Sequence, residues 1–227
     1  MDVANQFDAV LFDLDGTLVD TAPDMVAALL ALLDDEGREP LSYDLARSFV
    51  SNGAAGLINL AFPGVADDEH ERLRVRYLEK YEAAVCVHST LFPGLAELLD
   101  RFDAGNIPWG VVTNKPAYLT EPLLDALGLG SRAACKISGD TIPQRKPDPA
   151  PLLLASEQTG VSPSQSIYVG DAARDIEAGR RAGMHTVAVA YGYITADDDP
   201  AAWDAHRIVD DTVELAHLLL KGVSLGT

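Results

Sequence analysis

Residues 9–17 read AVLFDLDGT, in which four apolar residues are followed by two carboxylates, a glycine and a threonine. A short apolar run that ends in acidic and turn-forming residues is typical of a buried strand whose carboxyl end opens into a crevice. Similar apolar runs recur at residues 109–112, 167–169, 186–190 and 208–209, with a weaker run at 133–137. We interpret all six runs as parallel strands.

Helical patterns of apolar residues separate these runs, around residues 95–102, 119–127, 152–154 and 176–182. A glycine follows each of the four patterns, where a left-handed residue commonly closes the last helical turn; these are Gly105, Gly128, Gly160 and Gly183. Repeated strand and helix order implies right-handed crossovers. The pattern therefore predicts an α/β fold with a doubly wound parallel sheet.

Residues 19–89 break this rhythm. No convincing strand occurs between residues 23 and 88, but apolar residues repeat at helical spacing over 25–33, 57–62 and 73–81. Their combined length is far beyond that of one crossover helix. We predict an inserted helical cap domain at 19–89, with residues 1–18 and 90–227 forming the α/β core. The alternative is that these helices pack on a face of the sheet as another crossover.

The composition argues against several classes of protein. A net charge of −18 without a Lys/Arg-rich run argues against nucleic-acid binding. No apolar stretch is long enough to span a bilayer, and residues 1–6 lack the order of a signal peptide. Cys86 and Cys135 have no metal-ligand spacing, which predicts reduced, partly buried thiols. We expect a cytoplasmic protein, as a monomer or homodimer, that binds neither nucleic acid nor a membrane.

Asp13 and Asp15 are candidate acids of a phosphoryl-transfer site. Asp13, at the end of a strand, could attack phosphorus and form an aspartyl phosphate. Asp15 could protonate the leaving alkoxide and later deprotonate the hydrolytic water. Gly16 permits an unusual turn that lets backbone amides approach the phosphate, and Thr17 can cap the next helix or hold the loop. Taken alone, this acidic pair could also be a solvated turn or an incidental calcium ligand pair.

Polar residues after later strands could complete such a site. The Thr113 hydroxyl and the Asn114 amide can bind non-bridging phosphoryl oxygens, although Thr113 could also be an ordinary turn cap. Lys115 could either contact substrate or remain solvated, and we favour the solvated side chain. Lys146 lies on a stiff, proline-rich segment, where its ammonium would offset the repulsion between Asp13 and a phosphate. The alternative for Lys146 is a surface lysine beside a helix start.

Asp171 and Asp175 are the candidate metal-site residues. Asp171 ends the strand at 167–169, and Asp175 lies one helical turn later. Oxygen ligands at a strand end suit Mg²⁺, which would lie between Asp13, Asp171 and the substrate. We predict that Asp171 is a ligand and that Asp175 supports it. The alternatives are a helix cap for Asp171 and surface pairing with nearby arginines for Asp175.

Four motifs together resemble those of the haloacid dehalogenase superfamily of phosphotransferases, over essentially the whole chain. They occur in order at residues 13–17, 113–114, 146–147 and 170–175. The resemblance implies a set of roles: nucleophile Asp13, acid/base Asp15, phosphate stabilisers Thr113 and Lys146, and magnesium ligands Asp13, Asp171 and the carbonyl of Asp15. The chain departs from the pattern at Ala172, where relatives often carry a small polar residue.

The inserted segment resembles the helical cap of the phosphoglycolate phosphatase branch, in Arg47 and the run SNGA at 51–54. The resemblance implies that Arg47, Asn52 and Gly53 contact substrate, and that the cap closes over it and chooses the leaving group. Residues 87–92, 109–116 and 191–203 also resemble N-acetylmuramic acid 6-phosphate phosphatases. We expect the aromatic residues of 191–203 to pack the last strand against its helix.

These patterns predict a magnesium-dependent phosphomonoester hydrolase that acts through an aspartyl phosphate on a small phosphorylated metabolite. The candidate substrates are 2-phosphoglycolate and N-acetylmuramic acid 6-phosphate. One alternative is a sugar-phosphate mutase of the same superfamily, which would return the phosphoryl group to a reoriented intermediate. A non-catalytic phosphoryl-binding relative is another, although no catalytic position is lost here. A dehalogenase would have no use for Asp15 as a leaving-group acid.

Overall fold

Six parallel strands form the central sheet of the computed structural model, which describes residues 7–223. In spatial order they are β5 (Cys135–Ile137), β4 (Trp109–Val112), β1 (Ala9–Phe12), β6 (Ser166–Gly170), β7 (His185–Val189) and β8 (Arg207–Val209). All their pairings are parallel, which confirms the predicted sheet, and the bounds differ from the predicted ones by no more than two residues. Residues 1–6, whose order argued against a signal peptide, lie outside the described range.

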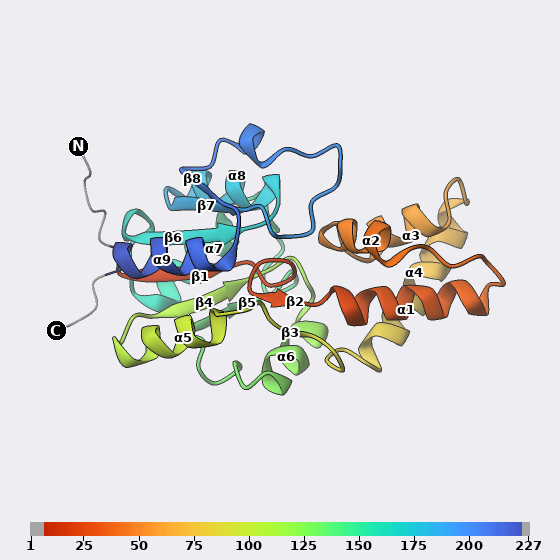
Figure 1. The fold of residues 1–227 in the computed structure, drawn as a ribbon, viewed down its shortest axis with the longest axis horizontal. Coiled ribbons are helices and arrows are strands. Elements are labelled where there is room, and N and C mark those ends of the chain that lie inside the picture. The colour runs from red at the N-terminus through yellow and green to blue at the C-terminus, as the bar shows by residue number, and fades with distance from the viewer. Residues whose placement is uncertain (1–6, 224–227) are drawn as a thin grey trace.

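Helices cover both faces of this sheet (Figure 1). The core helices of the described range are α5 (Leu95–Ala104), α6 (Ala117–Ala126), α7 (Ala150–Thr159), α8 (Ala173–Ala182) and α9 (Thr212–Gly222), with 3₁₀ turns η2 (Pro163–Gln165) and η3 (Pro200–Trp203). Leu11 of β1 shares a buried cluster with residues of α7 and α8, whereas Val10 and Phe12 share one with residues of α5 and α9. Because β1 is buried on both faces, its sequence is an unbroken apolar run.

The glycine prediction holds at three of the four helix ends. Gly128, Gly160 and Gly183 have φ values of 71°, 70° and 80°. At the end of α5 the prediction is wrong, because Gly105 has φ −86° and the left-handed residue is Asn106, with φ 53°. Asparagine tolerates this conformation, and it lets the Ile107 amide donate 2.9 Å to the carbonyl of Phe102.

The inserted segment is helical, as predicted, and lies beyond one end of the sheet (Figure 1). Its elements are α1 (Ala22–Asp35), α2 (Tyr43–Ser48), the 3₁₀ turn η1 (Val50–Asn52), α3 (Gly53–Ala61) and α4 (Asp67–Glu82). Of these, α2 has too few apolar residues to be visible as a period. Tyr77 of α4 stacks beside Tyr81 and donates its hydroxyl to the carbonyl of Met25 in α1, 3.2 Å away. We retain residues 19–89 as the proposed cap domain.

A short antiparallel strand pair joins this cap to the core. β2 (Val19–Asp20) pairs with β3 (Thr90–Leu91), at the two points where the chain enters and leaves the cap. Two-residue strands carry no readable period, so the sequence did not predict them. Next to the pair, the carboxylate of Asp24 accepts hydrogen bonds from the backbone amides of residues 87–89 and from the Ser89 hydroxyl.

Two observations within residues 7–223 bear on the predictions made from composition. Cys86 and Cys135 are unpaired, and they are half-buried and buried, respectively. Within the same range, every helix is too short or too polar to cross a membrane.

Candidate active site

The carboxyl ends of β1 and β6 bring three acids together at one edge of the sheet. Asp13 follows β1, and Asp171 follows β6. Carboxylate oxygens of Asp13, Asp171 and Asp175 lie within 4.8 Å of one another, and all three residues are buried. Segments more than 150 residues apart in the chain therefore meet in one acidic cluster, because parallel strands end at a common edge.

Lys146 lies inside this cluster. Its ammonium is 2.7 Å from Asp13 Oδ1 and 2.7 Å from Asp175 Oδ1, and it also donates to the carbonyl of Val112. Burial alone would lower the pKa of this lysine, but the attraction of Asp13 and Asp175 outweighs burial and raises it. Lys146 is therefore a buried cation, and the alternative of a surface lysine is wrong.

The side chain of Asn114 holds the backbone of Lys146 in place. Its amide group donates to the carbonyl of Lys146 at 2.9 Å and accepts from the Lys146 amide at 3.0 Å. The sequence offered only the backbone amide of Asn114 as a phosphate ligand. A side-chain link between positions 114 and 146 has no signal in the sequence.

Asp171 has one satisfied and one unsatisfied carboxylate oxygen. Its Oδ2 accepts from Ser51 Oγ at 2.6 Å and from the Tyr193 amide at 2.9 Å. Its Oδ1 is buried and has no hydrogen-bond partner within residues 7–223. Burial, together with the negative charges of Asp13 and Asp175, raises the pKa of Asp171 to about 7.

This donor set fits a divalent cation. A buried carboxylate oxygen without a donor costs free energy, and a cation beside it would offset that cost. Hard oxygen ligands are those that Mg²⁺ prefers. Gly16 leaves room for the arrangement, since it has φ +83° and a Cβ there would collide with the Asp171 carboxylate.

Asp175 contacts both the loop after β6 and the Lys146 ammonium. Its Oδ2 accepts from the Ala172 amide at 3.1 Å, while its Oδ1 faces Lys146. The side chain is fully buried, so the alternative of surface pairing with arginines is wrong. Asp175 thus fixes the loop that carries Asp171.

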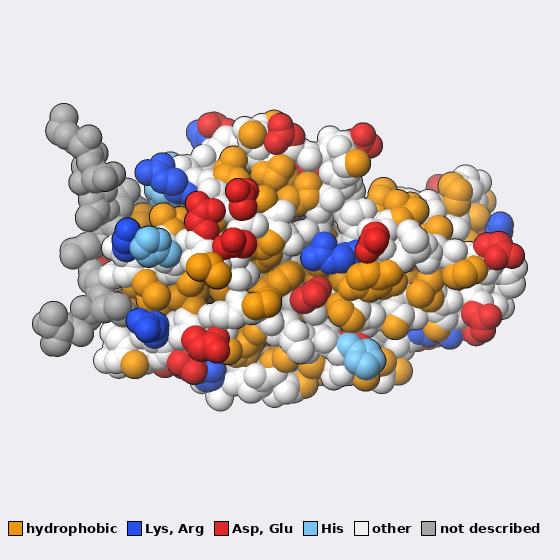
Figure 2. Space-filling model, in the orientation of Figure 1, with side chains coloured by type: hydrophobic (Ala, Val, Ile, Leu, Met, Phe, Trp, Pro, Cys, Tyr) orange, Lys and Arg blue, Asp and Glu red, His pale blue; other side chains and the backbone are white. Residues whose placement is uncertain are grey.

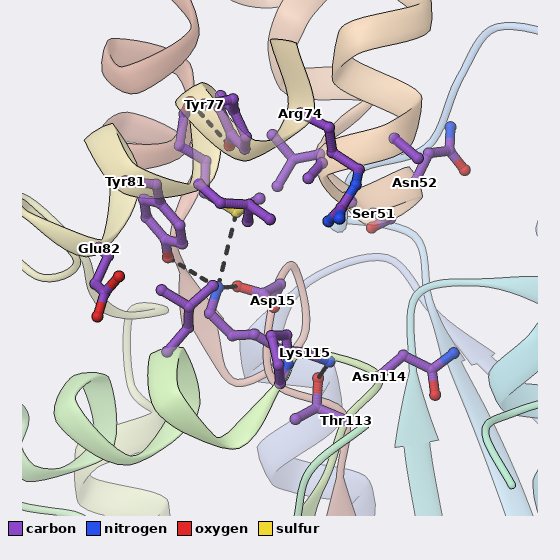
Figure 3. Close-up of a pocket in the computed structure, with 18 of the residues that line it drawn as sticks. Asp15, Ser51, Asn52, Arg74, Tyr77, Tyr81, Glu82, Thr113, Asn114 and Lys115 are labelled. Atoms are coloured by element: carbon purple, nitrogen blue, oxygen red, sulfur yellow. Dashed lines mark hydrogen bonds and ion pairs between the residues drawn. The ribbon is translucent and has the colours of Figure 1, made fainter. Parts of the chain in front are cut away.

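Asp15 is held by a pair of donors. Its Oδ1 accepts from Thr21 Oγ1 at 2.6 Å and from Lys115 Nζ at 2.9 Å. The expectation that Lys115 is solvated is wrong: it is 8% exposed, and its ammonium also donates to the hydroxyl of Tyr81 at 2.8 Å (Figure 3). An acid from the core and a tyrosine from α4 replace water around this ammonium. The sequence carries no signal for a contact between residues 81 and 115.

A cavity of about 970 Å³ lies above these groups, between the core loops and the cap (Figure 3). Asp13, Asp15, Thr113, Asn114 and Lys146 line it from the core, and Ser51, Asn52, Gly53 and Arg74 line it from the cap. Thr113 Oγ1 accepts from the Lys115 amide at 3.1 Å. The Thr17 hydroxyl is buried and has no hydrogen-bond partner within residues 7–223, so neither of its predicted roles is observed.

Arg47 is the candidate that the structure places elsewhere. Instead of lining the cavity, its guanidinium contacts the carbonyls of Tyr191 and Gly192, each at 3.4 Å, and lies 4.8 Å from the ring centre of Tyr193. Arg47 thus links α2 to the loop after β7. The guanidinium makes a contact between cap and core, and a contact of Arg47 with substrate stays a prediction.

The aromatic residues of 191–203 divide between two roles. Trp203 shares a buried cluster with Ile176 of α8 and Ala188 of β7, not with β8 and its helix α9, so the expected packing is wrong at this residue. For Tyr191 and Tyr193 the expectation is wrong, because both rings pack near Phe92 and their hydroxyls reach the start of the cap connection, at the Thr17 carbonyl and the Asp20 carboxylate. Packing of distant segments decides this arrangement.

Comparisons with known proteins agree with the geometry. The family model described as haloacid dehalogenase-like hydrolase matches residues 10–189. An N-acetylmuramic acid 6-phosphate phosphatase from Pseudomonas putida is 45% identical over 212 residues, covering 93% of this chain and 95% of its own length. A phosphoglycolate phosphatase from Xanthomonas campestris is 43% identical over 207 residues, covering 91% and 94%. Among solved structures, a predicted phosphoglycolate phosphatase from Haemophilus somnus has a TM-score of 0.83 at 29% identity, covering 94% of this chain and 98% of that chain.

Proposed function

This chain belongs to the haloacid dehalogenase-like hydrolase family, and we propose that it is a magnesium-dependent phosphomonoester hydrolase working through an aspartyl phosphate. Curated relatives at 43–45% identity are phosphatases, and so is this protein. The observation that carries the mechanism is the Lys146 ammonium, 2.7 Å from Asp13 Oδ1, beside a second carboxylate with an unpartnered oxygen.

Asp13 is the nucleophile in this proposal. Lys146 holds one carboxylate oxygen of Asp13 and leaves the other to attack phosphorus, forming the aspartyl phosphate and releasing the alkoxide. The same ammonium reduces the repulsion between the carboxylate and the phosphate. The Thr113 hydroxyl and the Asn114 backbone amide, at the same edge, would donate to the non-bridging oxygens.

Asp15 is the general acid and base. Thr21 and Lys115 hold its Oδ1, so its other oxygen would carry the proton that the leaving alkoxide takes. In the second half of the reaction, the same oxygen would remove a proton from the water that attacks the aspartyl phosphate. Asp13 cannot do this, because its carboxylate is then part of the acyl phosphate.

Mg²⁺ would be held by Asp13, Asp171 and the carbonyl of Asp15, and when bound it would neutralise charge on the phosphoryl oxygens. Asp175 would position Asp171 and Lys146. Asn52 and Gly53 line the leaving-group side, whereas Arg47 would hold the cap on the core. The substrate class is a small phosphorylated metabolite, with 2-phosphoglycolate and N-acetylmuramic acid 6-phosphate as candidates from the relatives' names. Cytoplasmic location and a monomeric or homodimeric state remain predictions.

The test is phosphate release by the Asp13→Asn variant. We expect a loss of at least about 10⁴-fold in kcat, since loss of a covalent nucleophile typically removes most of the chemistry. The substrates would be the two candidates, hexose phosphates and nucleotides, each with Mg²⁺ or with a chelator.

The matched control is Asp8→Asn. Asp8 precedes the same strand at its amino end, on the far side of the sheet from the acids, where its carboxylate accepts from the exposed Gln165 at 2.6 Å. This variant should keep full activity. Near-normal turnover by Asp13→Asn would contradict the covalent mechanism, and interconversion of sugar-phosphate isomers without phosphate release would indicate a mutase instead.

A further inference from the structure

The cavity above the acids is larger than a two-carbon substrate needs. Its volume of about 970 Å³ lies near the top of the range of about 300–1,000 Å³ for sites that enclose drug-sized ligands. A two-carbon acid phosphate is much smaller than such ligands, whereas a phosphorylated amino sugar is comparable to them. The volume therefore favours a leaving group the size of a sugar.

Arg74 of α4 lines the cap side of this cavity and points into it (Figure 3). Its guanidinium pairs with Glu71, one turn earlier in the same helix, at 2.6 Å and 2.7 Å. The side chain of Glu71 is 57% exposed. Ion pairs of this kind contribute little free energy, so the guanidinium of Arg74 can exchange Glu71 for an anion in the cavity.

The other cations of the cavity wall belong to the core and are already bound to acceptors of the core or the cap. Lys146 and Lys115 face Asp13 and Asp15. The guanidinium of Arg174 donates to the Ser51 carbonyl at 2.7 Å, and that of Arg145 donates to a loop carbonyl at 2.6 Å. Arg74 is thus the wall cation that comes from the cap, away from the reacting acids.

The charges along α4 also make one side of the cavity positive and the other side negative. Glu79 and Glu82 line it further along the same helix, and Figure 3 places Glu82 on the opposite side of the cavity from Arg74. A ligand carboxylate would be repelled near Glu82 and attracted near Arg74. Hydroxyl or amide donors of a sugar would be accepted on the side of Glu82.

We propose that Arg74 is a specificity residue that binds a carboxylate carried by the leaving group of a sugar-sized phosphomonoester. A guanidinium and a carboxylate match in a two-point hydrogen-bonded pair, which fixes orientation as well as charge. The inference rests on the proposed phosphatase function. It favours a phosphorylated sugar acid over a two-carbon acid as the substrate.

The test compares two sugars that differ in one group. N-acetylmuramic acid 6-phosphate carries a lactyl carboxylate, and N-acetylglucosamine 6-phosphate is the same sugar without it. We expect the wild type to prefer the acid, and Arg74→Gln to lower kcat/KM for the acid roughly tenfold to a hundredfold through KM, with the neutral sugar unchanged. Arg74→Lys keeps the positive charge but cannot form the two-point hydrogen-bonded pair. Its kcat/KM for the acid should therefore lie between the values for the wild type and for Arg74→Gln.

Arg72→Gln is the matched control. Arg72 lies two positions away on the opposite side of α4, where it pairs with Glu36 and Glu69 and does not line the cavity. It should leave the preference for the acid unchanged, and thermal unfolding should show both glutamine variants folded.

The inference is overturned if Arg74→Gln slows both sugars equally, if the wild type does not prefer the acid, or if 2-phosphoglycolate alone responds to the substitution. Hydrolysis of p-nitrophenyl phosphate separates this failure from failure of the proposed function. If the wild type hydrolyses that ester and Asp13→Asn does not, the chemistry holds even where the role of Arg74 is refuted.

Discussion

The active site has a floor, formed by the core residues Asp13, Lys146 and Asp171, and a wall on the cap side that includes Arg74. The side chains of these two regions are held in place differently. On the floor, Asp13, Lys146 and Asp171 are each less than 5% exposed, and every one is held by partners from other segments. On the wall, the side chain of Arg74 is 33% exposed and is held only by an exposed neighbour. The rigid floor suits a reaction that is the same for every phosphate ester, and the adaptable wall suits the choice among esters.

Contacts that cross between the two regions show how they cooperate. Ser51 of the cap donates to Asp171 of the core at 2.6 Å, and Tyr81 of the cap accepts from Lys115 at 2.8 Å. Both core residues adjoin the groups that would carry the reaction. With the cap in this position, both contacts fix the surroundings of the core acids and would exclude water from them.

Substitution of Lys146 by methionine should give the largest effect and tests the floor. Without its ammonium, the buried carboxylates of Asp13 and Asp175 would lose the cation that contacts both of them. We expect the free energy of unfolding in urea to fall by about 3–5 kcal/mol and phosphate release to be lost. Lys136→Met is the control, because Lys136 is exposed on β5 and should change neither. A stable, active Lys146→Met variant would refute the picture of a rigid charged floor.

Substitution of Asp24 by alanine tests how much the hydrogen bonds at the junction of cap and core stabilise the protein. The change leaves the amides of residues 87–89 without their acceptor, so we expect a loss of about 2–4 kcal/mol in the free energy of unfolding. Asp34→Ala, exposed on the same helix, should cost little.

The pH dependence offers a second check on Asp24. Burial raises the pKa of Asp24, but its bonds to Ser89 and to the backbone amides outweigh burial and hold the pKa below 3.8. The stabilisation should be complete above pH 3.8 and should fade as the pH drops through the lowered value. A difference between wild type and variant that persisted in strong acid would contradict this role.

Tyr81→Phe should give the smallest effect and tests the link between wall and floor. The lost hydrogen bond frees Lys115, which positions Asp15, so we expect kcat to fall about fivefold. Tyr77→Phe is the control. It removes a buried tyrosine hydroxyl bond from the same helix, to the Met25 carbonyl, without touching Lys115. Equal losses of kcat in both variants would show that Tyr81 acts only through stability.

The sequence by itself determined the six strands of the central sheet, their parallel direction and the segments that supply the acids. Apolar runs and strand-end polar residues report which faces are buried and which edge carries the chemistry, so Asp13 and Asp171 could be assigned to one edge. The left-handed residue after α5 was predicted at Gly105 and lies one residue later. The error is this small because the repeat of apolar residues shows where the helix ends.

Only the tertiary structure decided what surrounds those acids. Lys115 was expected in solvent and lies buried between Asp15 and Tyr81, and Arg47 was expected on substrate and lies on the carbonyls after β7. These contacts join segments from 34 to 145 residues apart. A local pattern cannot report them, because it records whether a residue is buried but not which distant side chain packing brings beside it.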